Sequence, residues 1–222
     1  ACLFAEAGFP VVGIRRSQHK VDMINRGECP IEGKEPGLPE LVARVASHGR
    51  LRATTDYAPC RDADVVLIAV ETPVDPDTKK PRYHALRGAL TDLAPHLSPG
   101  TLVIIESTIA PGTMDRVVKP LLERESGLQA DSAVNLQPST FNVQRRFFLV
   151  NCPERVMPGK LLHNIRHMHR VVGGMSPEAA DLAVHFYRHV VEGDLDPVDC
   201  LTAELVKTME NAYRDVQIAF AN

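Results

Sequence analysis

The stretch Ala63-Asp64-Val65-Val66-Leu67-Ile68-Ala69-Val70 is an almost unbroken apolar run. A strand with one face in solvent alternates apolar and polar residues, whereas a continuous apolar run is typical of a strand covered on both faces. Residues 101–106, Thr-Leu-Val-Ile-Ile-Glu, repeat this pattern, and a helical pattern over residues 84–97 separates the two runs. A buried strand, a helix and a second buried strand in this order predict a parallel sheet.

The same alternation extends outward in both directions. Towards the amino terminus the patterns predict a helix ending at Gly8, a strand over residues 10–14, a helix from Ser17 to Arg26, a helix over residues 38–48 and a strand over residues 51–54. Towards the carboxyl terminus they predict a helix over residues 113–125, strands over residues 147–150 and 170–172, an extended piece near Val190 and a helix from Asp199 to the end. The predicted fold is therefore α/β, with a doubly wound, mostly parallel sheet that carries helices on both faces.

Two features set the expected domain limits. Residues 129–146 are polar and without a period, so we interpret them as a surface excursion. The long final helical pattern predicts a division into residues 1–196, a sheet domain, and residues 197–222, the start of a connecting helix. The chain opens at Ala1 rather than Met and stops at Asn222 inside a helical pattern, so we expect it to be part of a longer protein.

Composition excludes several classes of function. The 222 residues carry 25 Lys and Arg against 28 Asp and Glu, a net charge of −3, which gives no electrostatic reason to expect a nucleic-acid or anionic-membrane partner. No apolar run approaches the roughly 18 residues that a membrane-spanning helix needs. The five cysteines are scattered without a CxxC pair, so we expect a reduced, cytoplasmic protein.

Ligands of a doubly wound sheet bind beyond the carboxyl ends of its strands, so candidate site residues lie just after each strand. Arg15 follows the strand at residues 10–14, in the position where dinucleotide-binding folds usually carry an acid for the adenosine ribose. A guanidinium there suits a 2′-phosphate instead, or belongs to a solvated pair with Arg16. Thr72 and Thr108 follow the two buried strands and present hydroxyls at the sheet edge, or serve as turn and cap residues.

Carboxylate, ammonium and amide groups complete the candidates. Glu154 stands in a Cys-Pro-Glu turn after a strand, where it suits a general base or an exposed turn residue. On the final helix Glu204, Lys207 and Asn211 share one face at i, i+3 and i+7, an arrangement that suits either an oxyanion site or a solvated Glu-Lys ion pair. We predict no metal site, because the histidine pairs lack further ligands at a suitable spacing, and we interpret Cys152 as a structural thiol.

The chain carries a series of short motifs that resemble those of the nucleotide-sugar dehydrogenases, the UDP-glucose and GDP-mannose dehydrogenase group. These motifs follow one another along nearly the whole chain, apart from residues 129–146. The motifs are Gly8-Phe-Pro-Val-Val-Gly-Ile14, Lys20-Val21, Ile24-Asn25-Arg-Gly27, Pro30-Ile31-Glu32, Gly37-Leu38-Pro-Glu-Leu41, Val70-Glu-Thr-Pro73, Ser107-Thr-Ile-Ala-Pro-Gly-Thr113, Pro153-Glu-Arg-Val-Met-Pro-Gly159, Thr202-Ala-Glu-Leu-Val-Lys207 and Glu210-Asn-Ala-Tyr213. The form Pro-Glu-Arg-Val before Pro-Gly looks most like the branch that oxidises UDP-N-acetyl-mannosamine.

The resemblance implies a four-electron oxidation of a UDP-sugar C6 alcohol to the uronic acid, with two NAD molecules used in turn and a cysteine that traps the aldehyde. It assigns cofactor contacts to Thr72 and Thr108, and we expect Arg15 and Lys20 to contact the cofactor as well. It assigns catalytic roles to Glu154, Lys207, Asn211 and Thr108, and substrate contacts to Glu154, Arg155, Lys160, Lys207 and Asn211. It also implies a homodimer through the connecting helix.

Three departures from the family pattern leave alternatives open. The resemblance places the first strand and the glycine-rich turn of a Rossmann-like fold before Ala1, and the nucleophilic cysteine after Asn222, so we expect this piece alone to be inactive. Arg15 in place of the ribose-binding acid leaves NADP open beside NAD. UDP-glucose or UDP-N-acetylglucosamine remains an alternative substrate, and a catalytically inactive nucleotide-binding or dimerisation module remains an alternative function.

Overall fold

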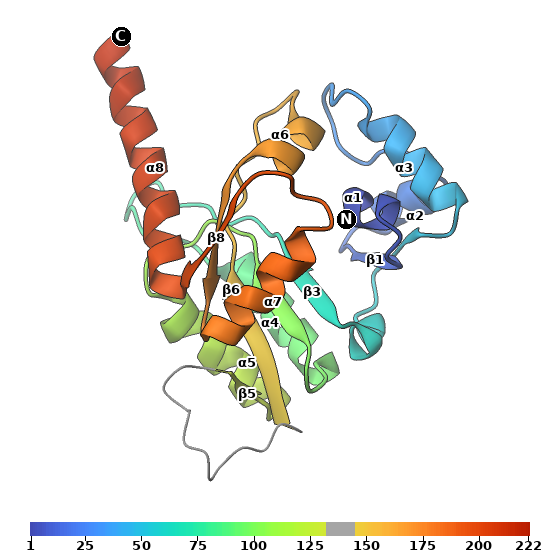
Figure 1. Ribbon diagram of the computed structural model, residues 1–222, viewed down its shortest axis with the longest axis horizontal. Coiled ribbons are helices and arrows are strands. Elements are labelled where there is room, and N and C mark those ends of the chain that lie inside the picture. The colour runs from blue at the N-terminus through green and yellow to red at the C-terminus, as the bar shows by residue number, and fades with distance from the viewer. Residues whose placement is uncertain (132–144) are drawn as a thin grey trace. The chain divides into compact units, whose positions relative to one another are not determined.

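The computed structural model describes residues 1–131 and 145–222, and the chain forms two compact units. The first unit consists of Ala1–Pro59, Arg155–His169 and Phe186–Asp194, and the second of Cys60–Glu154, Arg170–His185 and Leu195–Asn222. Figure 1 labels their helices and strands. In the described part of the chain, no helix is long and apolar enough to cross a membrane.

The second unit is built on a six-stranded sheet with the order β3-β4-β6-β7-β8, and β5 pairs with β6 beside this path. Its strands are β3 (Val65–Ile68), β4 (Leu102–Ile105), β5 (Gln129–Ala130), β6 (Arg146–Asn151), β7 (Arg170–Gly174) and β8 (Leu195–Asp199). All pairings are parallel except that of β6 with β7. The four residues of β4 are fully buried, as expected of a strand covered on both faces.

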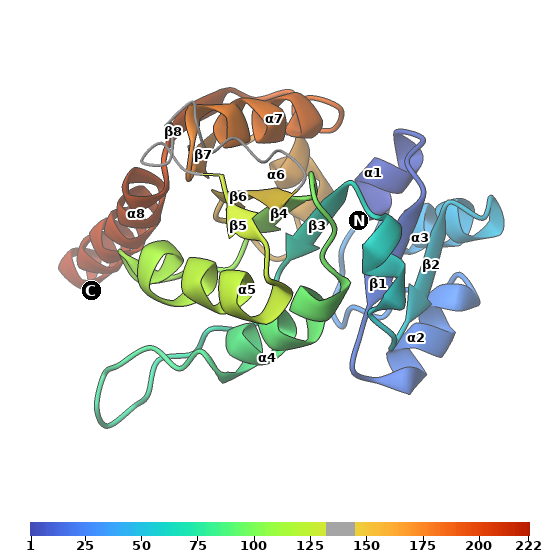
Figure 2. The same ribbon diagram turned by 90° about the horizontal axis from the view of Figure 1, so that it is seen from below.

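Helices cover both faces of this sheet. Figure 2 shows α4 and α5 on one face and α7 on the other. The bounds of the helical elements are α4 (His84–Leu93), the 3₁₀ turns at Ala58–Asp62 and Ala94–His96, the π-helical turn at Met114–Val118, α5 (Lys119–Ser126) and α7 (Pro177–Tyr187). Leu86, Leu90 and Leu93 recur at helical spacing on α4 and are almost completely buried. The helical period therefore turns the apolar face of α4 to the sheet.

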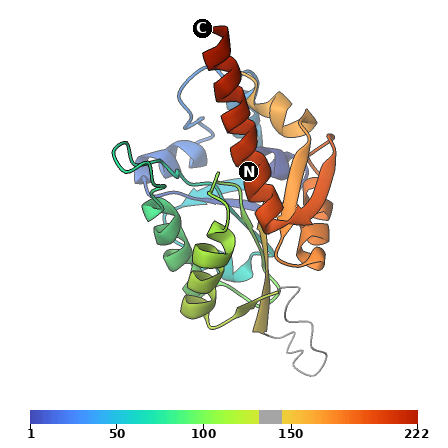
Figure 3. The same cartoon turned by 90° about the vertical axis from the view of Figure 1, so that its left-hand side faces the viewer.

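The last helix, α8 (Cys200–Ala221), starts directly after β8. The Asp199 carboxylate caps it by accepting hydrogen bonds from the Thr202 backbone N–H (2.9 Å) and hydroxyl (2.6 Å). Its first turn packs closely on β7, where a Cβ on Gly173 would lie 2.6 Å from the Cβ of Ala203. Beyond this turn α8 extends past the sheet, as Figures 1 and 3 show.

The first unit contains a parallel pair of strands, β1 (Val11–Ile14) and β2 (Leu51–Thr54). Its helices are α1 (Cys2–Glu6), α2 (Gln18–Asn25), α3 (Leu38–Ser47) and α6 (Leu161–His167). Buried apolar side chains from α1, α2, α3 and β2 form one core cluster. The Asn25 side chain joins α2 to β2, since it donates to Ala53 O (3.0 Å) and accepts from Ala53 N (2.7 Å).

The predicted α/β class, the mostly parallel sheet and the long final helix are confirmed. Two details are wrong. The extended piece near Val190 lies in a turn, since its N–H donates to Tyr187 O, and the last strand is Leu195–Asp199 instead. Residues 129–146 are not all loop, because β5 occupies Gln129–Ala130 and β6 begins at Arg146. The rest of that prediction, residues 132–144, lies outside the described residues.

Candidate active-site edge

The carboxyl ends of β3 and β4 are joined by side-chain hydrogen bonds. The Thr72 hydroxyl donates to Thr108 O (2.6 Å), so these two predicted residues are brought together. Beneath them, the Ser107 hydroxyl accepts from Val70 N (2.9 Å) and donates to Val70 O (2.7 Å). Thr72 and Thr108 are half-buried. The sheet edge therefore presents neutral polar groups on segments fixed by these hydrogen bonds.

The loop after β4 is held by Tyr83. The Tyr83 hydroxyl accepts from Ala110 N (2.9 Å) and lies 3.0 Å from the Thr113 hydroxyl. This loop leads into the helical residues that begin at Met114, and Gly112 within it has φ of +83°, a conformation that favours glycine. The backbone beside Thr108 is thus anchored at both ends.

Glu204 has a different environment from the one its helical position predicts. It is 1 % exposed, and its carboxylate accepts hydrogen bonds from Gly112 N (2.5 Å) and Met114 N (2.8 Å). Burial raises the pKa of Glu204, and the two backbone donors offset part of that effect. Glu204 therefore anchors the start of a neighbouring helix and does not share a solvated face with Lys207 and Asn211.

Glu154 lies at the carboxyl end of β6, next to the end of β4, where its backbone N–H donates to Glu106 O (3.1 Å). The Arg170 guanidinium donates to both oxygens of the Glu154 carboxylate, at 3.2 and 3.1 Å. The Glu154 side chain is 27 % exposed, so the ion pair with Arg170 leaves it only partly buried. This geometry suits a carboxylate that accepts a proton or orients a water.

Lys207 and Asn211 lie two and three turns along α8, and both are half-buried. The Asn211 Oδ1 accepts from Arg214 Nη2 (3.3 Å). Figure 1 shows α8 rising towards the side of the sheet on which β6 ends. The ammonium and amide groups therefore lie on a helix of the second unit that extends on the same side as Glu154.

The remaining predicted residues belong to the first unit. Arg15 is exposed directly after β1, and Lys20 is half-buried on α2. Arg155 is half-buried and Lys160 is exposed. The Glu35 carboxylate accepts from Gly159 N (2.7 Å) and Leu161 N (3.1 Å), and so holds the turn that carries Lys160.

Comparison with known proteins identifies the family. Residues 1–191 match the NAD-binding domain of the UDP-glucose/GDP-mannose dehydrogenase family. The chain belongs to this family. Over its whole length the chain is 36 % identical to a UDP-N-acetyl-D-mannosamine dehydrogenase of Campylobacter jejuni, and it covers 52 % of that protein.

Two solved structures of the dehydrogenase family share its fold. One is the UDP-D-ManNAc dehydrogenase of Pyrococcus horikoshii, with a TM-score of 0.87 and 36 % identity over 100 % of this chain and 49 % of that one. The other is the NDP-N-acetyl-D-galactosaminuronic acid dehydrogenase of Methanosarcina mazei Go1, with a TM-score of 0.87 and 38 % identity over 99 % of this chain and 45 % of that one. The chain spans about half the length of the curated relatives it matches.

Two members of this edge are not identified as site residues from the sequence alone. Arg170 was interpreted as part of a strand, and Glu106 as the last residue of another. A cation at the start of an otherwise apolar strand, Arg170-Val-Val, is the signal that points to a buried ion pair. Cys152 and Cys200 are buried, and burial raises the pKa of the Cys200 thiol well above its usual range. Among the described residues no group of three or more His, Cys, Asp or Glu is placed to hold a metal.

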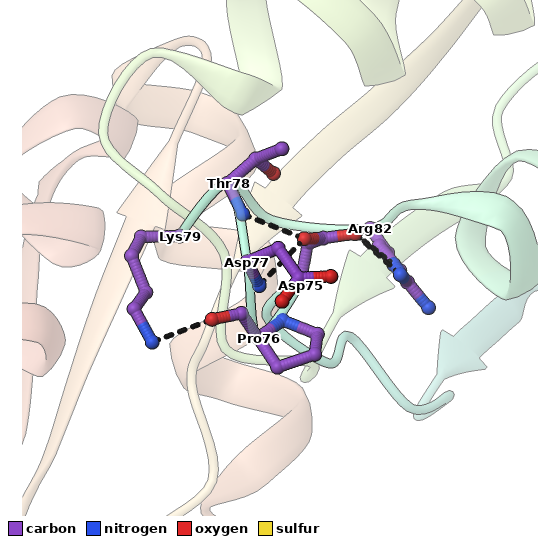
Figure 4. A network of polar contacts seen from close by, with 6 residues as sticks. All are labelled: Asp75, Pro76, Asp77, Thr78, Lys79 and Arg82. Carbon is purple, nitrogen blue, oxygen red and sulfur yellow. Dashed lines mark hydrogen bonds and ion pairs between the residues drawn. The ribbon is translucent and has the colours of Figure 1, made fainter.

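The loop after Thr72 is closed by one carboxylate, shown in Figure 4. Asp75 accepts from the backbone of Asp77 (3.0 Å) and Thr78 (2.8 Å) and pairs with Arg82. The Thr78 backbone bond, followed by the Arg82 side chain, lowers the pKa of Asp75 to about 2.

We therefore expect the hydrogen bonds and the ion pair of the Asp75 carboxylate in this loop to persist down to acid pH. A lowered folded pKa stabilises the closed loop above the ordinary aspartate value, and this contribution is lost as the pH falls towards about 2. A ¹³C NMR titration of the Asp75 carboxyl group measures this, and Arg82→Gln should move the midpoint upward. A midpoint at the ordinary value in the unmodified protein would contradict the expectation.

Proposed function

We propose that the full-length protein oxidises the C6 alcohol of a UDP-sugar to the carboxylate with NAD, and that UDP-N-acetyl-mannosamine is the substrate. The observation that supports this most is the carboxyl edge of the sheet, where a half-buried carboxylate, Glu154, is fixed near the joined segments of Thr72 and Thr108. A general base and neutral hydroxyls at a sheet edge suit alcohol oxidation with a bound dinucleotide.

Thr72 and Thr108 are proposed to hold the nicotinamide end of the cofactor. Both side chains are half-buried and neutral, which suits the uncharged carboxamide of the nicotinamide. Neutral groups also add no charge beside the nicotinamide ring, whose own charge changes when it accepts the hydride. Bound NAD supplies the hydride acceptor. What these residues contribute is orientation, because the Thr72 hydroxyl bond to Thr108 O and the Tyr83 bond to Ala110 N keep both segments in one conformation.

Glu154 is proposed to accept a proton or orient the hydrolytic water, and Lys207 and Asn211 to stabilise an oxyanion or hold that water. Arg155 and Lys160 are proposed as substrate contacts. The proposal for Lys160 is supported by the Glu35 carboxylate, which fixes the turn before Lys160 by accepting a hydrogen bond from Gly159 N. Exposure of Lys160 leaves its ammonium available to an anionic ligand.

The choice of sugar is tested with the complete gene product and a panel of UDP-sugars, by following NADH formation. The similar relatives include a UDP-N-acetyl-D-mannosamine dehydrogenase and an NDP-N-acetyl-D-galactosaminuronic acid dehydrogenase. The panel therefore includes UDP-N-acetyl-mannosamine and UDP-N-acetyl-galactosamine together with UDP-glucose and UDP-N-acetylglucosamine. We expect the highest kcat/KM with UDP-N-acetyl-mannosamine. No turnover with any of these sugars would defeat the proposal.

Arg15 is proposed to read the 2′ position of the cofactor. In the full-length enzyme we expect Arg15→Asp to raise the KM for NADP relative to NAD by about tenfold, because a carboxylate repels a 2′-phosphate and accepts from ribose hydroxyls. Initial rates with each cofactor measure the ratio. The control is Arg16→Asp at the adjacent exposed position, which should change it less. An unchanged ratio in both variants would remove Arg15 from the cofactor site.

The proposal extends to domain limits and assembly. Residues 1–196 would form the dinucleotide-binding domain and residues 197–222 the start of a connecting helix through which two copies pair. Support comes from apolar side chains that remain exposed along α8 at helical spacing, namely Leu201, Leu205, Met209, Tyr213, Val216 and Phe220. A cytoplasmic location belongs to the same proposal and is supported by five scattered cysteines that include no CxxC pair.

We expect Met209→Glu with Tyr213→Glu to convert a dimer of the full-length protein to a monomer, because two charges in an apolar interface are costly to desolvate. Both side chains are about two-thirds exposed in the single chain, at 67 % and 68 %. Sedimentation velocity measures the change, with Asp215→Asn on the same helix as the control. A dimer that survives the double substitution places the interface elsewhere.

A further inference from the structure

Arg170 is the only lysine or arginine among the described residues that is buried. It opens β7, an otherwise apolar strand that runs antiparallel to β6 with Asn151 opposite Gly173. Continuing that register brings Arg170 level with Glu154. The side chain is 2 % exposed, so the guanidinium lies beneath the carboxyl edge of the sheet and not on the surface.

Two carboxylates meet this guanidinium. Arg170 Nη2 donates to Glu154 Oε1 (3.2 Å) and Oε2 (3.1 Å), and Arg170 Nη1 lies 3.8 Å from Glu106 Oε1. A buried guanidinium needs anionic partners to offset its lost hydration, and here they come from the ends of two neighbouring strands. Because Arg170 Nη2 lies within hydrogen-bond distance of both Glu154 oxygens, the guanidinium restricts the positions that the carboxylate can adopt.

Exposure rises outward through this cluster. Arg170 is 2 % exposed, Glu106 16 % and Glu154 27 %. The cation therefore contacts Glu154 from the buried side of this cluster. The Glu154 N–H bond to Glu106 O (3.1 Å) fixes the main chain at the same point. The backbone of Glu154 is thus held by Glu106, and its side chain is held by Arg170.

We propose that Arg170 is a positioning residue for the Glu154 carboxylate, with Glu106 as its second anionic partner. This rests on the proposed function, in which Glu154 handles a proton or a water. Arg170 itself touches no reacting atom. Its effect is on orientation, and a displaced base lowers the rate of the chemical step more than it lowers ligand affinity.

The neighbouring strand β6 supplies a matched control for an arginine ion pair. Arg146 opens β6 at the opposite end of the sheet, is 19 % exposed, and pairs with the buried Asp131. Loss of this pair is expected to reduce stability without altering the orientation of Glu154. A comparison of the two arginines therefore separates positioning from a general contribution to folding.

The test uses the full-length enzyme with Arg170→Gln, Arg170→Lys and Arg146→Gln. We expect Arg170→Gln to lower kcat by about 10- to 100-fold while the KM values for NAD and the UDP-sugar change less than about threefold. Arg170→Lys keeps a buried charge and should recover part of the rate, and Arg146→Gln should retain the kcat of the unmodified enzyme. A kcat of folded Arg170→Gln within about twofold of the unmodified value would overturn the proposal. If the Gln variant does not fold, the Lys variant decides, since loss of the two-oxygen contact should still lower kcat.

A second measurement does not need turnover. The infrared difference between the unmodified protein and Glu154→Gln isolates the Glu154 carboxylate bands, and Arg170→Gln should shift them because the hydrogen bonds to both oxygens are lost. Unchanged bands would overturn the positioning role. An unmodified enzyme that oxidises no UDP-sugar defeats the proposed function instead, and the infrared shift still decides whether Arg170 positions the carboxylate.

Discussion

Glu204→Ala is expected to destabilise the second unit by about 3 kcal/mol. The Glu204 carboxylate is buried and accepts from Gly112 N and Met114 N, so removing it leaves two buried backbone donors at a helix start without their acceptor. Urea denaturation measures the loss, and hydrogen exchange of residues 112–118 localises it. The control Glu210→Ala, at an exposed position of the same helix, should change stability by less than about 0.5 kcal/mol.

Charge and hydrogen bonding at Glu204 are separable by pH. Because burial raises the folded pKa of Glu204, its proton is bound more tightly in the folded state, and the resulting stability is complete below the ordinary glutamate value. That contribution is lost as the pH rises through the folded pKa. Glu204→Gln keeps one acceptor oxygen and no charge, so it should lose less stability than Glu204→Ala and lack this pH dependence. Equal losses in both variants would contradict the role of the remaining acceptor.

The contrast between Glu204 and Lys207 shows what helical spacing predicts and what it cannot. Residues at i and i+3 share a face of α8, and that inference is correct as geometry. Yet the first turn of α8 packs against β7 and the start of the helix at Met114, and later turns extend past the sheet. Burial therefore changes along a single face, and only tertiary contacts determine where it changes.

Fold prediction succeeded where the period was strong and failed where it was weak. The apolar run at residues 63–70 and the helical pattern at residues 84–97 were placed correctly as β3 and α4. The two-residue strand β5 has no period of its own and exists only because Gln129 and Ala130 pair with Arg146 and Phe147. The sequence patterns also do not predict α6 and α7.

Site prediction was limited by long-range pairing. Thr72 and Thr108 were singled out because each follows a buried strand, and the bond between them follows from parallel neighbours ending at one edge. Arg170 was not predicted as a site residue because its partner Glu154 is 16 residues away in the sequence. The two residues come together only because β7 runs antiparallel to β6. Sequence showed a cation on an apolar strand but did not show which carboxylates surround it.

Lys207→Ala in the full-length enzyme is expected to lower kcat by about 100-fold or more, because an ammonium that stabilises developing negative charge acts mainly in the transition state. The KM for the UDP-sugar should change little by comparison, since binding of the neutral alcohol does not require that charge. Steady-state NADH formation measures both constants.

The control for a lost lysine is Lys119→Ala, where the ammonium pairs with Glu123 on α5 (3.8 Å) and should contribute little to the rate. Lys207→Arg adds a second comparison, because it keeps the charge but moves it on a longer, planar group, and should recover only part of the loss. If Lys207→Ala turns over as fast as Lys119→Ala, Lys207 does not stabilise an oxyanion. If kcat alone falls, the half-buried position of Lys207 on a helix that extends past the sheet edge is explained by catalysis.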